Sequence, residues 1–320
     1  MNAVLIIDKP AGLTSHDVVN RVRRILNQRS VGHLGTLDPM ATGVLPLVIG
    51  SFTRLAQFYT ASEKTYEGTI RFGFSTDTYD AEGEPTSPSQ DVTLYKDQLE
   101  VLAAKFRGVI EQLPPPFSAK KIQGVPAYKL ARKHKEVVLQ PVQVEIKEFE
   151  ILSVDAARAH FRARVASGTY MRSVAHDMGK ALGCGAHLES LRRTAVAEFT
   201  LADAHTLDAV SECGAGAHAR AADSAPHPVD TLDAFDSLCV HPRKLLPQFP
   251  SVTADDPTVN RIRAGRTVNL PELSRARQVK VFSGQRDLIA IATRVAGSLF
   301  HPKLVLATSD APAVPTVHGT

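Results

Sequence analysis

Residues 32–46 read GHLGTLDPMATGVLP, and this stretch decides how the rest of the chain is interpreted. Between Gly32 and Gly43 it holds three glycines and a proline, residue types that favour turns over regular structure. We therefore predict a long irregular loop, followed by a strand in the apolar run 44–49. A loop of this kind beside core segments is a natural place for a functional site.

Asp38 is the acidic residue of this loop, and its surroundings alone leave two interpretations open. An aspartate between a glycine and a proline can be a turn residue or a helix cap. It can also be a catalytic carboxylate, for which Tyr66, Tyr170 and Arg172 are possible partners, although sequence spacing does not bring them together. A carboxylate held against an arginine stays ionised when the pairing is close, and it can then act as a nucleophile.

Strands and helices are expected on both sides of the loop. Strand patterns occupy residues 4–7, 64–74, 142–154 and 158–166, whereas helical spacing begins near Ser15, recurs over 99–106 and returns after Gly168. This order does not follow the strict strand–helix alternation of a doubly wound sheet. The predicted fold class is therefore α+β with a mixed sheet.

Charge and composition divide the chain into parts. Residues 1–202 form a first, larger domain that contains the Asp38 loop, and residues 203–240 hold seven acidic and one basic residue around an Ala/Gly/Ser/Pro-rich centre. We interpret 203–240 as a flexible acidic linker. Residues 241–310 hold eleven basic and five acidic residues, a net +6 (11 − 5), with three strand-like runs, and residues 311–320 form a tail. Such a linker predicts that a chain ending near Pro250 remains folded.

A basic insertion is expected within the first domain at about residues 114–135. It contains six basic residues and no acidic ones, and it opens with three prolines. A projecting basic loop of this composition suits a polyanionic partner. Lys120, Lys121, Lys129 and Arg132 are the candidates for contact with a polyanion such as RNA.

Charge, cysteine content and hydrophobicity indicate which partners and which compartment to expect. The net charge of +4 and the pI near 8.9 fit an anionic partner without requiring one. The three cysteines match no metal-ligand spacing and predict reduced thiols, so no metal is expected. No stretch approaches the roughly 20 apolar residues of a membrane span, and the N-terminus has no basic leader. We therefore expect a cytoplasmic protein that contacts no membrane.

Five segments together resemble the TruB family of pseudouridine synthases. They occur in family order over about residues 3–200 and read DKPAGLTS (8–15), GHLGTLDPMATGVLP (32–46), KTY (64–66), GTYMRS (168–173) and GCGAHLESLRR (183–193). The resemblance implies a mixed-sheet catalytic domain with a small C-terminal β domain, more loosely similar to the PUA type. It also implies an enzyme that isomerises uridine 55 in the T loop of tRNA by flipping the base, without a cofactor.

The resemblance also implies roles for individual residues. Asp38 would be the nucleophile and Arg172 its ion-pair partner, while Tyr66 would stack on the target base and take part in loss of the C5 proton. The remaining substrate-binding residues would be Tyr170, Leu191 in the uracil pocket, and His33 inserted into the tRNA loop. By composition alone, His33 is better explained as a structural loop histidine, and the resemblance reverses that preference. Lys9 and Ser15 are expected to support the catalytic loop.

Two other functions share these motifs. One is a guide-RNA-dependent pseudouridine synthase acting within a multi-protein particle, and the other is a non-catalytic tRNA-binding or tRNA-folding protein. The intact set of Asp38, Tyr66, Tyr170 and Arg172 argues against a purely binding role. We expect a monomer that binds the T stem-loop of tRNA without an obligatory protein partner.

Overall fold

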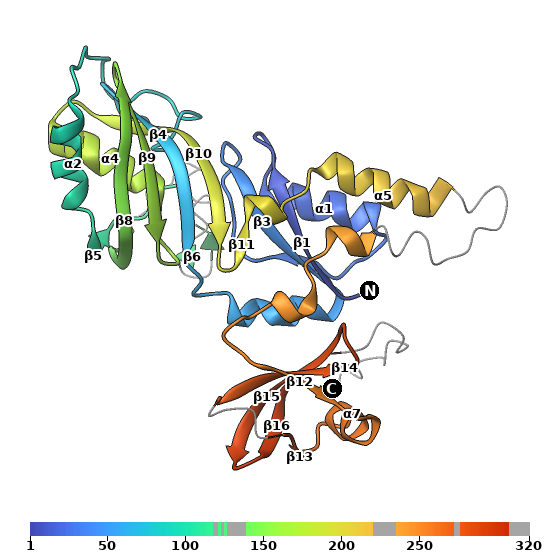
Figure 1. The fold of residues 1–320 in the computed structure, drawn as a ribbon. Helices are drawn as coiled ribbons and strands as arrows, with labels where there is room; N and C mark the ends of the chain where they lie inside the picture. Colours follow the sequence, from blue (N-terminus) through green and yellow to red (C-terminus); the bar gives the residue numbers. More distant parts are fainter. Residues whose placement is uncertain (118–120, 123–124, 127–138, 220–234, 272–275, 307–320) are drawn as a thin grey trace.

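The computed structural model describes residues 1–117, 121–122, 125–126, 139–219, 235–271 and 276–306. A large domain contains one mixed sheet with helices against it, and a smaller β domain lies beneath it (Figure 1). This agrees with the predicted α+β class. None of the helices within the described ranges is long and apolar enough to cross a membrane.

The large sheet places the two halves of the first domain side by side. Its strands run in the order β1-β3-β10-β4-β9-β8-β5, with β2 paired to β3 and β11 paired to β10. Their bounds are β1 Ala3–Lys9, β2 Val31–His33, β3 Thr42–Ile49, β4 Lys64–Phe72, β5 Gly108–Gln112, β8 Val142–Asp155, β9 Arg158–Val165, β10 Ala186–Val196 and β11 Phe199–Thr200. The strands predicted from alternation are confirmed, whereas β10 was recognised only as a motif.

The parallel pairing of β3 with β10 is the contact that brings distant motifs together. Thr42 lies opposite Arg192 and Gly43 opposite Arg193. A side chain on Gly43 would meet the Arg193 backbone oxygen at 2.2 Å, so this close approach requires glycine. The end of the catalytic loop is therefore joined directly to a strand some 150 residues later in the chain.

The helices of the large domain cover the sheet, and the first of them begins at a side-chain cap. α1 (Ser15–Ile25) starts after Thr14, whose side chain accepts from the Asp17 N–H while the Asp17 carboxylate accepts from the Thr14 N–H. The other elements are α2 Lys96–Ala104, α4 Met171–Leu182, α5 Leu207–Ala219 and the 3-10 segments η1 Gly50–Phe58 and η2 Leu201–Asp203. The helices expected near Ser15, around Leu99 and after Gly168 are confirmed.

The C-terminal part forms its own five-stranded sheet, in the order β12-β14-β15-β16-β13. Its elements are η3 Pro242–Lys244, β12 Ser251–Ala254, α7 Asp256–Arg263, β13 Val268–Asn269, β14 Gln278–Ser283, β15 Asp287–Ala296 and β16 Leu299–Val305. The predicted small β domain is therefore present.

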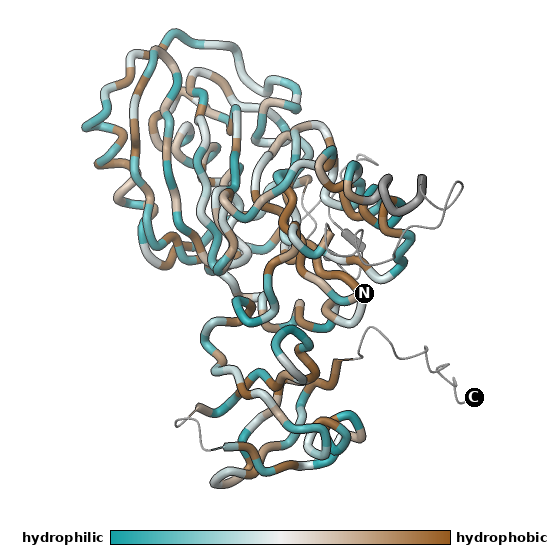
Figure 2. The backbone as a smooth tube through the Cα atoms, turned by 45° about the vertical axis from the view of Figure 1, so that its right-hand side comes forward, coloured by the Kyte–Doolittle hydropathy of each residue, from teal (hydrophilic) through white to brown (hydrophobic). Residues whose placement is uncertain are grey.

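The two sheets share a hydrophobic core, which corrects the expectation of independent domains. β1 alternates between two cores, because successive side chains of a strand point to opposite faces. Leu5 and Ile7 pack toward α1, whereas Val4 and Ile6 join a cluster that includes Leu288 of the small domain. Figure 2 shows apolar segments where the two domains meet. A chain ending near Pro250 would lose part of this core.

The segment predicted as a flexible linker is partly helical. α5 lies within it and packs against α1, with Leu207 and Val210 buried in the main core. Burial of these two apolar residues favours helix over a free chain, so the prediction of flexibility is wrong for residues 207–219. Residues 220–234 lie outside the described residues.

The basic insertion is described only in part. Strands β6 (Lys121–Ile122) and β7 (Val125–Pro126) pair with each other, and nothing is described of the Lys121 side chain. The other RNA-contact candidates, Lys120, Lys129 and Arg132, lie outside the described residues.

Candidate active site

The loop between β2 and β3 is held in place by side chains from outside it. The Ser15 hydroxyl donates to the Leu37 carbonyl and accepts from the Leu37 N–H, at 3.1 and 2.8 Å. The buried Lys9 ammonium donates to the carbonyls of Pro39 and Leu13, at 3.1 and 2.6 Å. These contacts confirm the expected supporting roles of Lys9 and Ser15.

Arg193 of β10 supports the same loop from its other end. Its fully buried guanidinium donates to the carbonyls of Gly35, Thr36 and Val44, at 3.0, 3.2 and 2.8 Å. A planar group with five donors can hold several carbonyls at once, which an ammonium cannot do in the same geometry.

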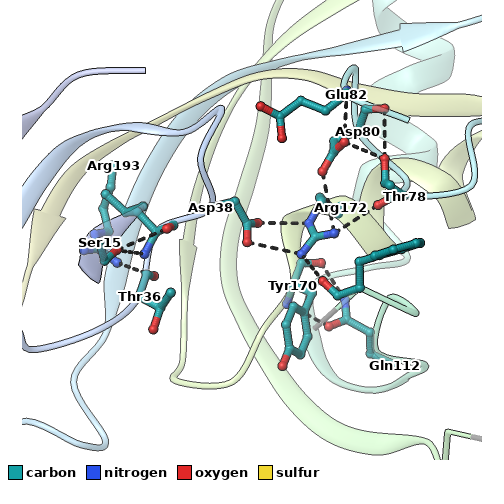
Figure 3. Close-up of polar contacts among 12 residues, drawn as sticks. Ser15, Thr36, Asp38, Thr78, Asp80, Glu82, Gln112, Tyr170, Arg172 and Arg193 are labelled. Carbon is teal, nitrogen blue, oxygen red and sulfur yellow. Dashed lines mark hydrogen bonds and ion pairs between the residues drawn. The ribbon is translucent and has the colours of Figure 1, made fainter. Parts of the chain in front are cut away.

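Asp38, in the middle of this loop, meets Arg172 at two points. The Arg172 Nε and Nη2 atoms donate to the two carboxylate oxygens at 2.9 and 3.2 Å (Figure 3). The Arg172 side chain is 5% exposed, whereas that of Asp38 is 36% exposed. The carboxylate is therefore oriented from behind by a buried cation while one side stays accessible.

Arg172 is itself fixed by three further contacts. It donates to the carbonyls of Thr78 and Phe117 at 3.0 and 2.9 Å, and its Nη1 atom lies 3.6 Å from the buried carboxylate of Asp80. Asp80 in turn accepts from the Thr78 hydroxyl at 2.6 Å. The guanidinium therefore lies between two carboxylates in a fixed plane.

A pocket of about 420 Å³ opens beside Asp38, within the range of small-ligand sites. Its lining includes the Asp38 loop, the two tyrosines Tyr66 and Tyr170, Arg172 and Leu191. Tyr66 comes from β4 and Leu191 from the neighbouring strand β10, and both are buried. The structure thus brings together the residues that the sequence could not place relative to one another.

Tyr170 stands at the start of α4, two residues before Arg172. The Gln112 side chain forms two hydrogen bonds with the Tyr170 backbone. It donates to the Tyr170 carbonyl at 3.1 Å and accepts from the Tyr170 N–H at 2.8 Å. The N–H and carbonyl of Tyr170, just before α4, are thus both satisfied by a side chain from outside the helix. The contact fixes the position from which both Tyr170 and Arg172 project.

His33 lies at the rim of the same pocket, at the end of β2. Its Nδ1 atom accepts a hydrogen bond from the Gly35 N–H at 3.3 Å. Burial, followed by the nearby Arg193 charge, lowers the pKa of His33 below its ordinary value. A neutral imidazole at the rim can stack on or wedge between bases without the cost of desolvating a charge.

Sequence reasoning missed three residues of this site: Asp80, Gln112 and Arg193. Arg193 was quoted within a motif, but nothing in its spacing indicated that it would be buried against the loop. Asp80 lies in a polar turn together with Glu82, whose pKa is raised by burial and by the Asp80 and Asp38 carboxylates. No local sequence pattern separates Asp80 and Glu82 from ordinary surface carboxylates. Within the described ranges, no cluster of His, Cys, Asp and Glu could hold a metal ion.

Comparison with known proteins agrees with this geometry. Residues 23–171 match the N-terminal domain of the TruB family of pseudouridylate synthases, and residues 172–233 match the tRNA pseudouridylate synthase B C-terminal domain. A curated protein of Solibacter usitatus named tRNA pseudouridine synthase B is 49% identical over 309 residues, covering 96% of this chain and 100% of its own length. The chain belongs to the TruB family.

Other TruB relatives match less of the chain or at lower identity. A tRNA pseudouridine synthase B of Azoarcus sp. is 38% identical, covering 96% of both chains. That of Aquifex aeolicus is 46% identical over 210 residues, covering 65% of this chain and 73% of its own length. The full-length alignments therefore include the C-terminal β domain.

Solved structures share the fold of this TruB chain. A chain of an H/ACA RNP bound to a substrate RNA containing 2'-deoxyuridine has a TM-score of 0.68 and 23% identity, covering 96% of this chain and 86% of its own length. A chain of a Cbf5-Nop10-Gar1 complex has a TM-score of 0.66 and 25% identity, covering 92% and 79%. The likeness spans both the large and the small domain.

Proposed function

We propose that this TruB family chain isomerises uridine 55 in the T loop of tRNA to pseudouridine, with Asp38 as the nucleophile. The observation that carries the proposal is the two-point contact of buried Arg172 with a carboxylate that still faces a pocket. Relatives named tRNA pseudouridine synthase B align over nearly the whole chain, which supports tRNA as the substrate.

Asp38 is suited to nucleophilic attack because Arg172 holds both of its carboxylate oxygens in place beside the pocket. Three routes remain open: attack on the ribose C1′, attack on the uracil C6, or assisted glycosidic cleavage through a glycal. In each route the base is freed, rotates within the pocket and reattaches through C5. Loss of the C5 proton then completes the reaction, and Tyr66 takes part in that step.

The pocket walls suit a flipped uracil. Extruding a base from a folded loop costs a few kcal/mol, and stacking on an aromatic face returns about 1–3 kcal/mol. Tyr66 would supply that face, while Tyr170 and Leu191 would confine the ring and His33 would hold the loop open. The basic candidates Lys120, Lys121, Lys129 and Arg132 would contact the RNA outside the pocket.

The proposal is tested with a tRNA transcript carrying tritium at C5 of its uridines. The purified chain should release tritium, and mapping of the product should place pseudouridine at a single position in the T loop. Release by the chain alone would exclude dependence on a guide RNA. If the purified chain binds the transcript tightly but releases no tritium, the proposal is refuted.

A further inference from the structure

Two basic side chains approach Gly35, in the wall of the pocket that contains Asp38. Gly35 has a positive φ of 129°, and a Cβ built on it would lie 3.5 Å from Lys64 Cε and 3.6 Å from Arg193 Nη1. Lys64 lines the pocket together with Gly35 and His33, and it begins strand β4 two residues before Tyr66. One wall of the pocket therefore carries the Lys64 cation, and a second cation, Arg193, is buried behind Gly35.

The charge of this wall is not neutralised within the described part of the chain. The Lys64 ammonium donates to the Ser62 carbonyl at 2.8 Å, and no ion pair with an acidic side chain is found for Lys64 or Arg193 among the described residues. Arg172 on the opposite side, by contrast, has two carboxylates. The pocket is thus polarised, with excess positive charge along the wall formed by Gly35 and Lys64.

Keeping a half-buried ammonium without a counter-ion is unfavourable. Burial, followed by the Arg193 charge, lowers the pKa of Lys64 to about 8. A bound anion at this wall would remove the penalty, because it would supply the missing opposite charge. The ligand expected here, if the proposed function holds, is a polyanion with one charge per nucleotide.

We propose that Lys64 binds a backbone phosphate of the RNA, at one of the two phosphodiester linkages that flank the uridine entering the pocket. The inference rests on the proposed function, since it takes the pocket to admit a flipped nucleotide. Lys64 would hold the backbone on one side of the pocket while Asp38 faces the ribose and base. Arg193, fully buried behind Gly35, adds positive potential but does not itself reach the RNA.

The experiment compares a synthetic T stem-loop RNA with versions in which a neutral methylphosphonate replaces either flanking linkage. Single-turnover conversion measured over a range of protein concentrations gives the half-saturating concentration for each RNA. The proteins are the parent chain, Lys64→Met, Lys64→Arg and the control Lys96→Met. Lys96 is a matched control because it also donates to a backbone carbonyl, that of Leu152 at 3.1 Å, but is exposed and lies outside the pocket.

We expect Lys64→Met to raise the half-saturating concentration about tenfold, as for loss of one charged hydrogen bond. The slope of log affinity against log salt concentration should be shallower for Lys64→Met than for the parent, by about 0.7 to 0.9. Lys64→Arg should lie near the parent and Lys96→Met should match it. One of the two neutral linkages should weaken binding to the parent by a similar factor but should not weaken binding to Lys64→Met further.

Equal half-saturation and equal salt slopes for the parent and Lys64→Met would overturn the inference. So would the finding that neither neutral linkage weakens binding to the parent more than binding to Lys64→Met. If Lys64→Met does not fold, the parent alone decides the matter. Its affinity for unmodified RNA should fall as the pH rises through 8, because Lys64 loses its proton, and a neutral linkage should remove that dependence. No conversion by the parent would instead refute the proposed function.

Discussion

Asp38 differs from other loop aspartates by its partner, not by its own position. Arg172 holds both carboxylate oxygens, so Asp38→Asn keeps the shape of the side chain but removes the charge that attacks the substrate. We expect turnover to fall to background while tRNA binding survives. Tritium release and equilibrium binding measured on the same preparation check this. Appreciable turnover by Asp38→Asn would remove Asp38 as the nucleophile.

Arg172 uses three of its nitrogen atoms on four partners: Asp38, Thr78, Phe117 and Asp80. Lysine keeps the charge but presents its donors from a single point, so Arg172→Lys cannot reproduce this plane. We expect kcat/KM to fall at least about tenfold, with most of the loss in kcat. Steady-state kinetics on a tRNA transcript measures the split. Kinetics equal to those of the parent would mean that charge alone matters at this position.

Arg193 and its neighbour Arg192 offer a direct comparison of buried and exposed arginines. Arg193→Met would remove the guanidinium hydrogen bonds to the carbonyls of Gly35, Thr36 and Val44. Because a buried polar group that loses its partner costs about 1–3 kcal/mol, the free energy of unfolding should fall by about 3 kcal/mol or more. Arg192→Met would instead remove an ion pair with Asp8 at the surface, where such pairs contribute about 0–1 kcal/mol. Urea denaturation of Arg193→Met and Arg192→Met measures the difference in the free energy of unfolding. Similar losses for the two would show that the buried contacts are not the source of stability.

At the scale of elements, α4 and the turn around Tyr79 act as one unit. Tyr79 has a φ of 66°, unusual for a residue with a side chain, and its ring stacks on His176 with centroids 3.8 Å apart. His176 lies one helical turn after Arg172, on the same face of α4. The stack therefore holds the turn from which Thr78 and Asp80 contact Arg172.

We expect Tyr79→Ala to lower the single-turnover rate about tenfold, since a small displacement of Arg172 misaligns Asp38. Tyr79→Phe keeps the ring and should retain the rate of the parent. Rates are measured at saturating RNA, and thermal unfolding of both variants separates misalignment from loss of fold. A rate for Tyr79→Ala equal to that of Tyr79→Phe would show that the stack does not position Arg172.

At the scale of the molecule, the small β domain supplies both core and charge. Because Phe282, Leu288 and Ile291 pack into the shared cluster, its role in RNA binding is tested by substitution and not by truncation. The exposed Arg277 and Lys303 line one depression of its surface. Changing both residues to Gln should weaken tRNA binding. The slope of log affinity against log salt concentration should also become shallower, by about 0.7 to 0.9 for each phosphate that is no longer neutralised. Parallel slopes in a salt series would mean that this face does not bind the RNA.

The sequence by itself determined the elements whose causes are local. Alternation predicted β4, strand patterns predicted β8 and β9, helical spacing beginning near Ser15 predicted α1, and glycine and proline predicted the irregular loop around Asp38. These features depend on neighbours within a few residues, so a pattern in the chain is sufficient to predict them. The family resemblance named Asp38, Tyr66, Tyr170, Arg172 and Leu191, but spacing alone gave no reason for them to meet.

Only the tertiary structure decided which distant groups share an environment. The pairing of β3 with β10 buries Arg193 against a loop some 150 residues earlier, and the pairing of β4 with β10 places Leu191 near Tyr66. The core shared by the two domains has the same origin, since Val4 and Leu288 carry no sign of each other in the sequence. Burial and charge pairing depend on distance in space, and that distance is set by sheet register and packing over the whole chain.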